Sequence, residues 1–259
     1  MRALSIAKFE EGVINEDAAI AKENLIAVSD GAGGGGVFAD RWSKYLVEHL
    51  PDNPIADYES FDKWIDSIWE PFYNDCEEKA KKEGGMFLNK YYDEGSFATL
   101  VAVWNNGQWI SYGDSVAFCY YRECGRLQHS FGRLVDFNNP PYLINCKDPL
   151  SEQGFKSGQF DIQPGSIVFA TSDALAHYIL MMYEVTHKEE FESELQEAIN
   201  AQTKGSNFIK ACMSQRKTDF EDVIKKLPMS NNAGNFKKHL ESLRKKGLIG
   251  HDDYTIAIM

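Results

Sequence analysis

Residues 24–36 read Asn-Leu-Ile-Ala-Val-Ser-Asp-Gly-Ala-Gly-Gly-Gly-Gly. The first six form a short apolar run rich in strand-forming residue types, and Asp30 and the glycines end it abruptly. We therefore predict a strand that ends at a carboxylate and continues into a glycine loop. Gly31 has a role of its own here, because a residue without a Cβ atom can turn its carbonyl toward a metal ion beside Asp30.

Acidic residues recur at strand ends or turns in four further segments: Asn15-Glu16-Asp17, Gly113-Asp114-Ser115, Ala170-Thr171-Ser172-Asp173-Ala174 and His251-Asp252-Asp253-Tyr254-Thr255. Carboxylates in such places are suitable ligands for hard cations such as Mg²⁺ or Mn²⁺. Three of them within about 5 Å would repel one another by about 3 kcal/mol per pair at an effective dielectric of about 20. Bound metal or protonation would have to offset that repulsion. We expect Asp30, Asp173 and Asp252 to hold a pair of divalent ions.

Each acidic segment also has a simpler interpretation when it is taken alone. Asp and Asn are common after strands because their side chains cap turns and helices. Asp173 in particular could be only the N-cap of the helix that follows it. The order of the five segments and their neighbours, rather than any single one, favours a metal site.

The remaining patterns predict an α+β protein. Strands are predicted at 3–9, 24–29, 97–104, 108–112, 116–121, 127–130, 165–171 and 254–259, with 137–160 as a loop. Helices are predicted at 37–50, at 173–183 and over much of the chain up to about residue 246. A further helix carries an apolar stripe that we assign to the core, with Ser60 as its N-cap and Gly84-Gly85 as its stop: Phe61, Trp64, Ile65, Ile68, Trp69, Phe72 and Cys76. Strands and helices do not alternate simply, so two antiparallel sheets packed together with helix pairs outside, in one domain over residues 1–259, fit best.

Composition limits the classes of partner. The 39 acidic and 27 basic residues give a net charge of -12, which disfavours nucleic acid and anionic membranes unless a local basic patch exists. The N-terminus lacks a signal-peptide pattern, and no run of 18 apolar residues occurs, so we expect a cytoplasmic protein. The five cysteines show no metal-type spacing and are expected to be reduced core thiols: Cys76, Cys119, Cys124, Cys146 and Cys212.

Taken in order, the acidic motifs resemble those of the metal-dependent protein serine/threonine phosphatases, the PPM or protein phosphatase 2C family, in a compact bacterial-type form. The likeness extends from about residue 3 to the C-terminus. The motifs that carry it are Asn15-Glu16-Asp17, Val28-Ser29-Asp30-Gly31-Ala32-Gly33-Gly34, Gly95-Ser96-Phe97-Ala98-Thr99, Gly113-Asp114-Ser115, Thr171-Ser172-Asp173-Ala174-Leu175 and Asp252-Asp253-Tyr254-Thr255.

This resemblance implies a four-layer α-β-β-α sandwich with two Mn²⁺ or Mg²⁺ ions at one end. It implies that Asp30 bridges both ions and that the Gly31 carbonyl binds one of them. Asp173 and Asp252 would complete the protein ligands of the other ion, and Asp114 with Asp173 would form a weaker third site. Glu16 and Asp17 would hold waters on the metals. The implied substrate is a phosphorylated protein, and we expect a monomer.

The sequence departs from the family pattern at the phosphate-binding position. The family has an arginine four residues before the glutamate of the first motif, where this chain has Gly12; Lys8 is the nearest cation. A lysine is a point charge and lacks the planar fork of arginine. Ala32 replaces a histidine that is common in eukaryotic members, and Ala174 replaces a glycine.

Neither histidine near the motifs replaces the missing arginine. His177 follows Asp173 by one helical turn and is expected to be structural, whereas His251, next to Asp252, is the better candidate for an indirect contact with the site.

Three hypotheses follow. The first is an active metal-dependent phosphatase. The second is a degenerate relative that binds metal or a phosphorylated partner with little turnover, which the loss of the arginine motivates. The third is a dinucleotide-binding oxidoreductase, because residues 31–36 satisfy the pattern G-x-G-x-x-G. Against the third, Asp30 would point a carboxylate at the pyrophosphate, and no second strand bears an acidic residue about 20 positions on.

Overall fold

A computed structural model describes residues 1–214, 219–229 and 232–259. Two five-stranded sheets pack face to face, and every strand pairing within the described residues is antiparallel. The first sheet has the order β1 (Arg2–Ile6), β12 (Tyr254–Ile258), β11 (Ile167–Thr171), β7 (Val116–Tyr121), β8 (Arg126–His129). The second has the order β10 (Phe155–Gln159), β6 (Gln108–Tyr112), β5 (Leu100–Trp104), β3 (Leu25–Ser29), β2 (Ala18–Ala21). The predicted sandwich of two antiparallel sheets is confirmed.

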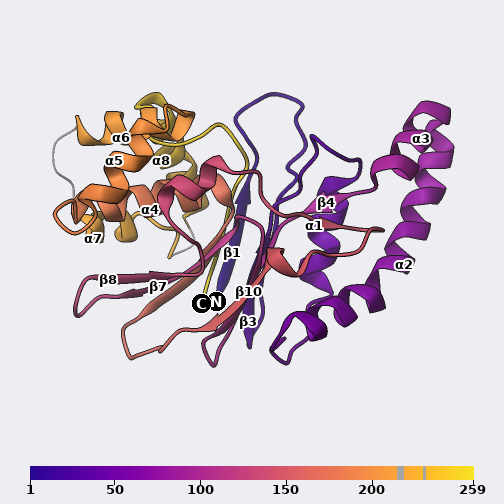
Figure 1. Cartoon of the computed structure of the whole chain (residues 1–259), viewed down its shortest axis with the longest axis horizontal. Coiled ribbons are helices and arrows are strands. Elements are labelled where there is room, and N and C mark those ends of the chain that lie inside the picture. Colours follow the sequence, from indigo (N-terminus) through magenta and orange to yellow (C-terminus); the bar gives the residue numbers. More distant parts are fainter. Residues whose placement is uncertain (215–218, 230–231) are drawn as a thin grey trace.

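Helices cover both outer faces, so that the sandwich has four layers (Figure 1). The β10-to-β2 sheet packs against α1 (Ala39–Glu48), α2 (Tyr58–Glu83) and α3 (Gly85–Glu94). The β1-to-β8 sheet packs against a larger lobe: α4 (Asp173–Thr186), α5 (Glu192–Asn200), α6 (Lys204–Met213), α7 (Phe220–Lys225) and α8 (Ala233–Lys245). This lobe is larger than the helix pair that the sequence predicted. The predicted helical segments at 215–218 and 230–231 lie outside the described residues.

The strand β3 shows why the sheets stack. Its residues are fully buried on both faces, since Leu25 and Ala27 pack toward the helices whereas Ile26 and Val28 pack into the core between the sheets. Residues in a strand alternate between its two faces, so a continuous apolar run suits a strand that is covered on both sides.

Several element predictions are wrong in detail. The segment 137–160, predicted as a loop, contains the short strand β9 (Ile144–Asn145), which pairs with β4 (Phe97–Ala98), and the edge strand β10. The helix α3 was not predicted. The N-cap of α2 is Asp57, whose side chain accepts a hydrogen bond from the Ser60 backbone N–H, so Ser60 lies inside the helix.

The apolar stripe of α2 is core as predicted, with five buried members (Phe61, Ile65, Ile68, Phe72 and Cys76), whereas Trp64 and Trp69 are only partly buried. All five cysteines are free, and four of them are buried; Cys124, in the β7–β8 turn, is exposed. Within the described residues, each helix is too short or too polar to cross a bilayer.

Strand register brings the acidic segments to one end of the sandwich. Ala18 pairs with Ser29, so Asp17 and Asp30 flank the same end of the β2–β3 pair. In the other sheet, Thr171 at the end of β11 pairs with both Ile256 and Val116, near the first residues of β12 and β7. The segments that carry Asp173, Asp252 and Asp114 therefore meet at this end.

Candidate metal and phosphate site

Asp30 and Gly31 are held in place by β4 and β5. The Asp30 backbone N–H donates to the Thr99 hydroxyl at 3.2 Å, and the Asp30 carbonyl accepts from the Thr99 N–H at 2.8 Å. The Thr99 hydroxyl also lies 2.7 Å from that of Ser115, in the turn that carries Asp114. A Cβ atom on Gly31 would lie only 2.5 Å from the Glu16 carbonyl oxygen and 2.7 Å from that of Ala39. Only glycine fits at this position.

Asp253 organises the loop that carries Glu16 and Asp17. One of its carboxylate oxygens accepts from the Lys8 N–H at 2.7 Å, and the other accepts from the Glu16 N–H at 2.8 Å. Asp253 is 3% exposed. A buried carboxylate that receives two backbone donors is a strong fixed link. It ties both ends of the β1–β2 loop to the segment that carries Asp252.

The carboxylates come close enough to perturb one another. Burial raises the pKa of the Asp30 carboxyl well above its ordinary value, and four neighbouring charges raise it further, those of Asp17, Asp173, Asp114 and Asp252. Desolvation and like charges both disfavour the ionised form, so each opposes loss of the proton. The raised pKa of Asp30 agrees with the strand register, which brings the acidic segments to one end of the sandwich.

The pKa values of the aspartates around Asp30 are raised as well. Burial raises the pKa of Asp17 to about 7, although the hydroxyls of Ser172 and Thr255 lower it, and burial raises that of Asp114 to about 6. Burial also raises the pKa of Asp173 well above its ordinary value, and the charges of Asp114, Asp252 and Asp17 add to the effect.

Two acidic groups at the edge of the site lie near a cation. Burial raises the pKa values of Asp252 and Glu16, while the positive charge of Lys8 lowers both. Lys8, in the β1–β2 loop, is therefore a positive charge that acts on both carboxyl groups.

The donor set suits hard divalent cations, because it consists of carboxylates with a backbone carbonyl at Gly31. Among the residues that the structure describes, the buried Oδ2 atom of Asp17 has no hydrogen-bond partner, which leaves this oxygen able to accept a donor or to bind a cation. Within the described ranges, however, no three acidic, histidine or cysteine side chains are arranged to hold a metal ion as they stand. Asp173 accepts from the Ala174 N–H at 2.5 Å, and Asp252 accepts from the Asp253 N–H at 2.9 Å. Each of these two carboxylates thus accepts a hydrogen bond from the backbone N–H of the next residue in the chain.

Comparisons with known proteins address the fold. No protein-family model matches this sequence, and no curated protein matches it. Among solved structures, the catalytic domain of the serine/threonine protein phosphatase PstP in complex with two manganese ions matches with a TM-score of 0.54 and 15% identity, over 99% of this chain and 95% of that one. This chain has the fold of the PPM serine/threonine phosphatases.

Two further solved structures with the PPM fold match over 99% of this chain. The PstP/Ppp phosphatase of Mycobacterium tuberculosis does so with a TM-score of 0.50, 17% identity and 96% of its own chain covered. The PPM Ser-Thr phosphatase MsPP of Mycobacterium smegmatis, in complex with cacodylate, has a TM-score of 0.50, 14% identity and 96% coverage. The resemblance seen in the sequence is thus confirmed as a likeness of fold. The dinucleotide hypothesis is wrong, because it requires parallel strands around the glycine loop.

Gly12 is the position at which the sequence resemblance led us to expect a phosphate-binding arginine, and it has no side chain. It is exposed, has a φ of +78°, and a Cβ atom there would meet nothing within 4 Å. The basic residue nearest to Gly12 in the sequence is Lys8. Its neighbour Phe9 packs on Tyr254, with ring centroids 5.6 Å apart, and the Arg244 guanidinium lies 5.4 Å from the Phe9 ring. These contacts link the residue next to Lys8 to β12 and α8.

The two histidines differ in role. His177 packs between the rings of Phe137 and Phe208, and burial lowers its pKa to about 4, so it is a partly buried structural residue as expected. His251 hydrogen-bonds to Glu10 and lowers the pKa of Asp252 through its charge. Sequence reasoning placed Asp253 and Thr99 in motifs but gave them no role, since long-range hydrogen bonds leave no local signal.

Proposed function

We propose that this protein is a metal-dependent phosphatase that hydrolyses phosphoserine and phosphothreonine esters in proteins. One observation carries the proposal: strand register brings acidic residues from five separate segments to a single end of a sandwich with the PPM fold. Structures of this fold include one with two manganese ions bound, which supports Mn²⁺ or Mg²⁺ as the cofactor.

Asp30 and the Gly31 carbonyl would hold the ions from the end of β3, and Asp173 and Asp252 from the ends of β11 and β12. Asp114 would serve a weaker third ion. Two bound divalent cations would lower the pKa of a water and offset charge on the phosphoryl oxygens. Release of the protons that burial and repulsion favour on Asp30 and Asp173 would accompany binding.

The other groups of the chain would orient the reactants. Glu16 and Asp17 directly precede β2. Their carboxylates would accept hydrogen bonds from water there. The Asp253 carboxylate binds the backbone N–H groups of both Glu16 and Lys8, so that it holds these two parts of the loop together. Lys8 would then hold a phosphate oxygen of the substrate, the part that Gly12 cannot play. Its single point charge would position the phosphate less tightly than an arginine fork.

Hydrolysis of p-nitrophenyl phosphate by the purified protein tests the proposal. We expect Mn²⁺-dependent release of p-nitrophenolate that an Asp30→Asn variant loses, with circular dichroism to show that the variant is folded. Calorimetric titration with Mn²⁺ provides a second readout that does not need turnover. Failure of the wild-type protein to exceed the Asp30→Asn variant would contradict enzymatic activity.

The degenerate-relative hypothesis remains the second candidate, because Gly12 provides no phosphate ligand and Asp173 is engaged with its own helix. It predicts calorimetric Mn²⁺ binding without hydrolysis, together with binding of a phosphoserine peptide but not of its unphosphorylated form. Hydrolysis above the Asp30→Asn background would exclude it.

A further inference from the structure

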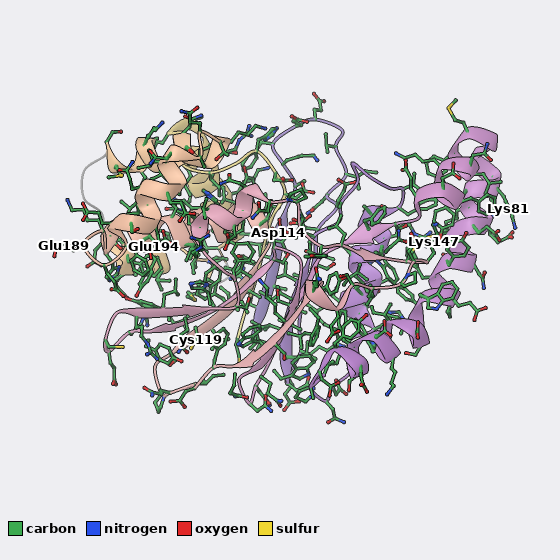
Figure 2. The ribbon with its side chains drawn as sticks, viewed as in Figure 1. Lys81, Asp114, Cys119, Lys147, Glu189 and Glu194 are labelled. Atoms are coloured by element: carbon green, nitrogen blue, oxygen red, sulfur yellow. The ribbon has the colours of Figure 1, made fainter. Side chains whose placement is uncertain are left out.

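A second hollow lies in the helical lobe, separate from the carboxylate site. It encloses about 730 Å³ between α4, α6, α7 and α8 and the start of the link from α4 to α5. None of the acidic motif residues lines it. Figure 2 shows Glu189, on its rim, at the outer edge of the lobe, whereas Asp114 lies at the centre of the molecule. We call this hollow the α4–α8 cavity.

The floor of the α4–α8 cavity is apolar and polarisable. Tyr178 and Met182 of α4 and Leu243 of α8 contribute buried side chains, and the Cys212 thiol lies 3.3 Å from the Met182 sulfur. Methionine side chains adapt to irregular ligands, and small-molecule sites combine apolar side chains with polar groups that fix the orientation of the ligand. Volumes of about 300–1,000 Å³ are usual for such sites.

One wall of the cavity is cationic. Lys226 and Lys246 follow the last residues of α7 and α8, and His239 lies between them on the cavity lining. Both lysines lower the pKa of His239, in addition to the larger effect of burial, so their charges converge on this wall. Neither lysine makes an ion pair within the part of the chain that the structure describes.

The helix dipole explains only part of this arrangement. A lysine at a helix C-terminus is favourable by itself because it interacts with the negative end of the dipole. The dipole does not require, however, that two such lysines line the same apolar cavity. The acidic residues of the lining, Glu189 and Glu190, stand in the α4–α5 link and do not figure among the charges that act on His239. Lys188, which also lines the cavity, stands in the same link beside these two carboxylates, whereas the α7–α8 wall carries Lys226 and Lys246 with no acidic residue of the lining on those two helices.

We propose that the α4–α8 cavity binds a small anionic amphiphile, with its acidic head at Lys226 and Lys246 and its apolar body on Met182, Tyr178 and Leu243. The head can be a carboxylate, a sulfonate or a phosphate, since each accepts charge-assisted hydrogen bonds from lysine. The proposal is independent of phosphatase activity, because the lining contains no residue of the carboxylate site.

Fluorescence titration of the full-length protein with 1-anilinonaphthalene-8-sulfonate, an anionic aromatic amphiphile, tests the site. We expect saturable binding of one molecule per chain. The double variant Lys226→Met with Lys246→Met should weaken it about tenfold or more, the change expected from loss of about 1.4 kcal/mol. The matched control is Lys225→Met with Lys245→Met, which removes the same charge one residue earlier on the same two helices. Lys225 is paired with Asp222, and neither control lysine lines the cavity, so binding should change less than about twofold.

Competition with ligands that share one alkyl chain then identifies the head group. Dodecanoate and dodecyl phosphate should displace the dye below their micellar concentrations, and dodecylamine should not. Displacement by dodecanoate alone would identify a carboxylate source, and displacement by dodecyl phosphate alone a phosphate source. Absence of saturable binding, equal weakening in the two double variants, or equal displacement by dodecylamine would overturn the proposal.

Discussion

Glu184 provides a quantitative test of burial in this fold. It lies on α4 and is 3% exposed, and its Oε2 atom has no hydrogen-bond partner in the described part of the chain. Burial raises its pKa from 4.5 to about 7, and the charge of Glu194 adds to the effect. The difference, converted at about 1.4 kcal/mol per pH unit, corresponds to about 3 kcal/mol against the ionised form.

The pH window follows from these two pKa values. Below pH 4.5 the Glu184 carboxyl is protonated in both the folded and the unfolded chain, so no charge is buried on folding. Between pH 4.5 and about 7 the folded state binds more protons than the unfolded chain. Stability therefore falls as the pH rises through this window and stays lowered above it. Glu184→Gln cannot ionise, so its free energy of unfolding relative to wild type should rise by about 3 kcal/mol across the window. The free-energy cost of burying the glutamine amide does not depend on pH, so it does not affect the change across the window.

Urea unfolding at a series of pH values from below 4.5 to about 8 measures this difference. The exposed Glu192 of α5 provides the control, because Glu192→Gln removes a carboxylate without changing a buried charge. Its unfolding free energy should follow that of wild type within about 0.5 kcal/mol. Parallel pH profiles for Glu184→Gln and wild type would refute the assignment of this carboxyl as a buried, destabilising acid.

Three further predictions concern the site. Lys8→Met should lower kcat/KM for a phosphopeptide by about tenfold or more, since a charge-assisted contact is worth about 1.5–3 kcal/mol. The control Lys22→Met, at the far end of β2, should leave kcat/KM unchanged. Equal kinetics in the two variants would contradict the role of Lys8. Asp253→Asn should weaken Mn²⁺ affinity by about 10–100-fold in calorimetry, the usual effect of losing a group that orients ligands, and unchanged affinity would count against the loop anchor. Gly31→Ala should destabilise the fold by about 1–3 kcal/mol in urea unfolding, whereas Gly34→Ala, where a Cβ atom meets nothing within 4 Å, should be neutral; a neutral Gly31→Ala would contradict the close approach of the Glu16 and Ala39 carbonyls.

The strands that the sequence located best are those whose packing leaves a local pattern. β6 and β7 have the predicted bounds, because turn residues on both sides delimit their apolar runs. β10 was missed because it is an edge strand with a largely exposed pattern, whose pairing with β6 rather than its composition makes it a strand. Asp57 was missed as the cap of α2 because Ser60 is an equally plausible capping residue three positions on.

The pattern of acidic residues at strand ends, with Asp30 between a buried strand and a glycine loop, could be recognised from the sequence alone. So could the sandwich class and the absence of a side chain at Gly12, because residue type and short-range pattern determine them. Tertiary structure alone decided that five acidic segments share one end, that Asp253 fastens the β1–β2 loop, and that Lys226 and Lys246 line one cavity. Those relations depend on strand register and helix packing between residues more than 200 positions apart in the case of Asp253 and Lys8. Local propensity carries no information about contacts at that range.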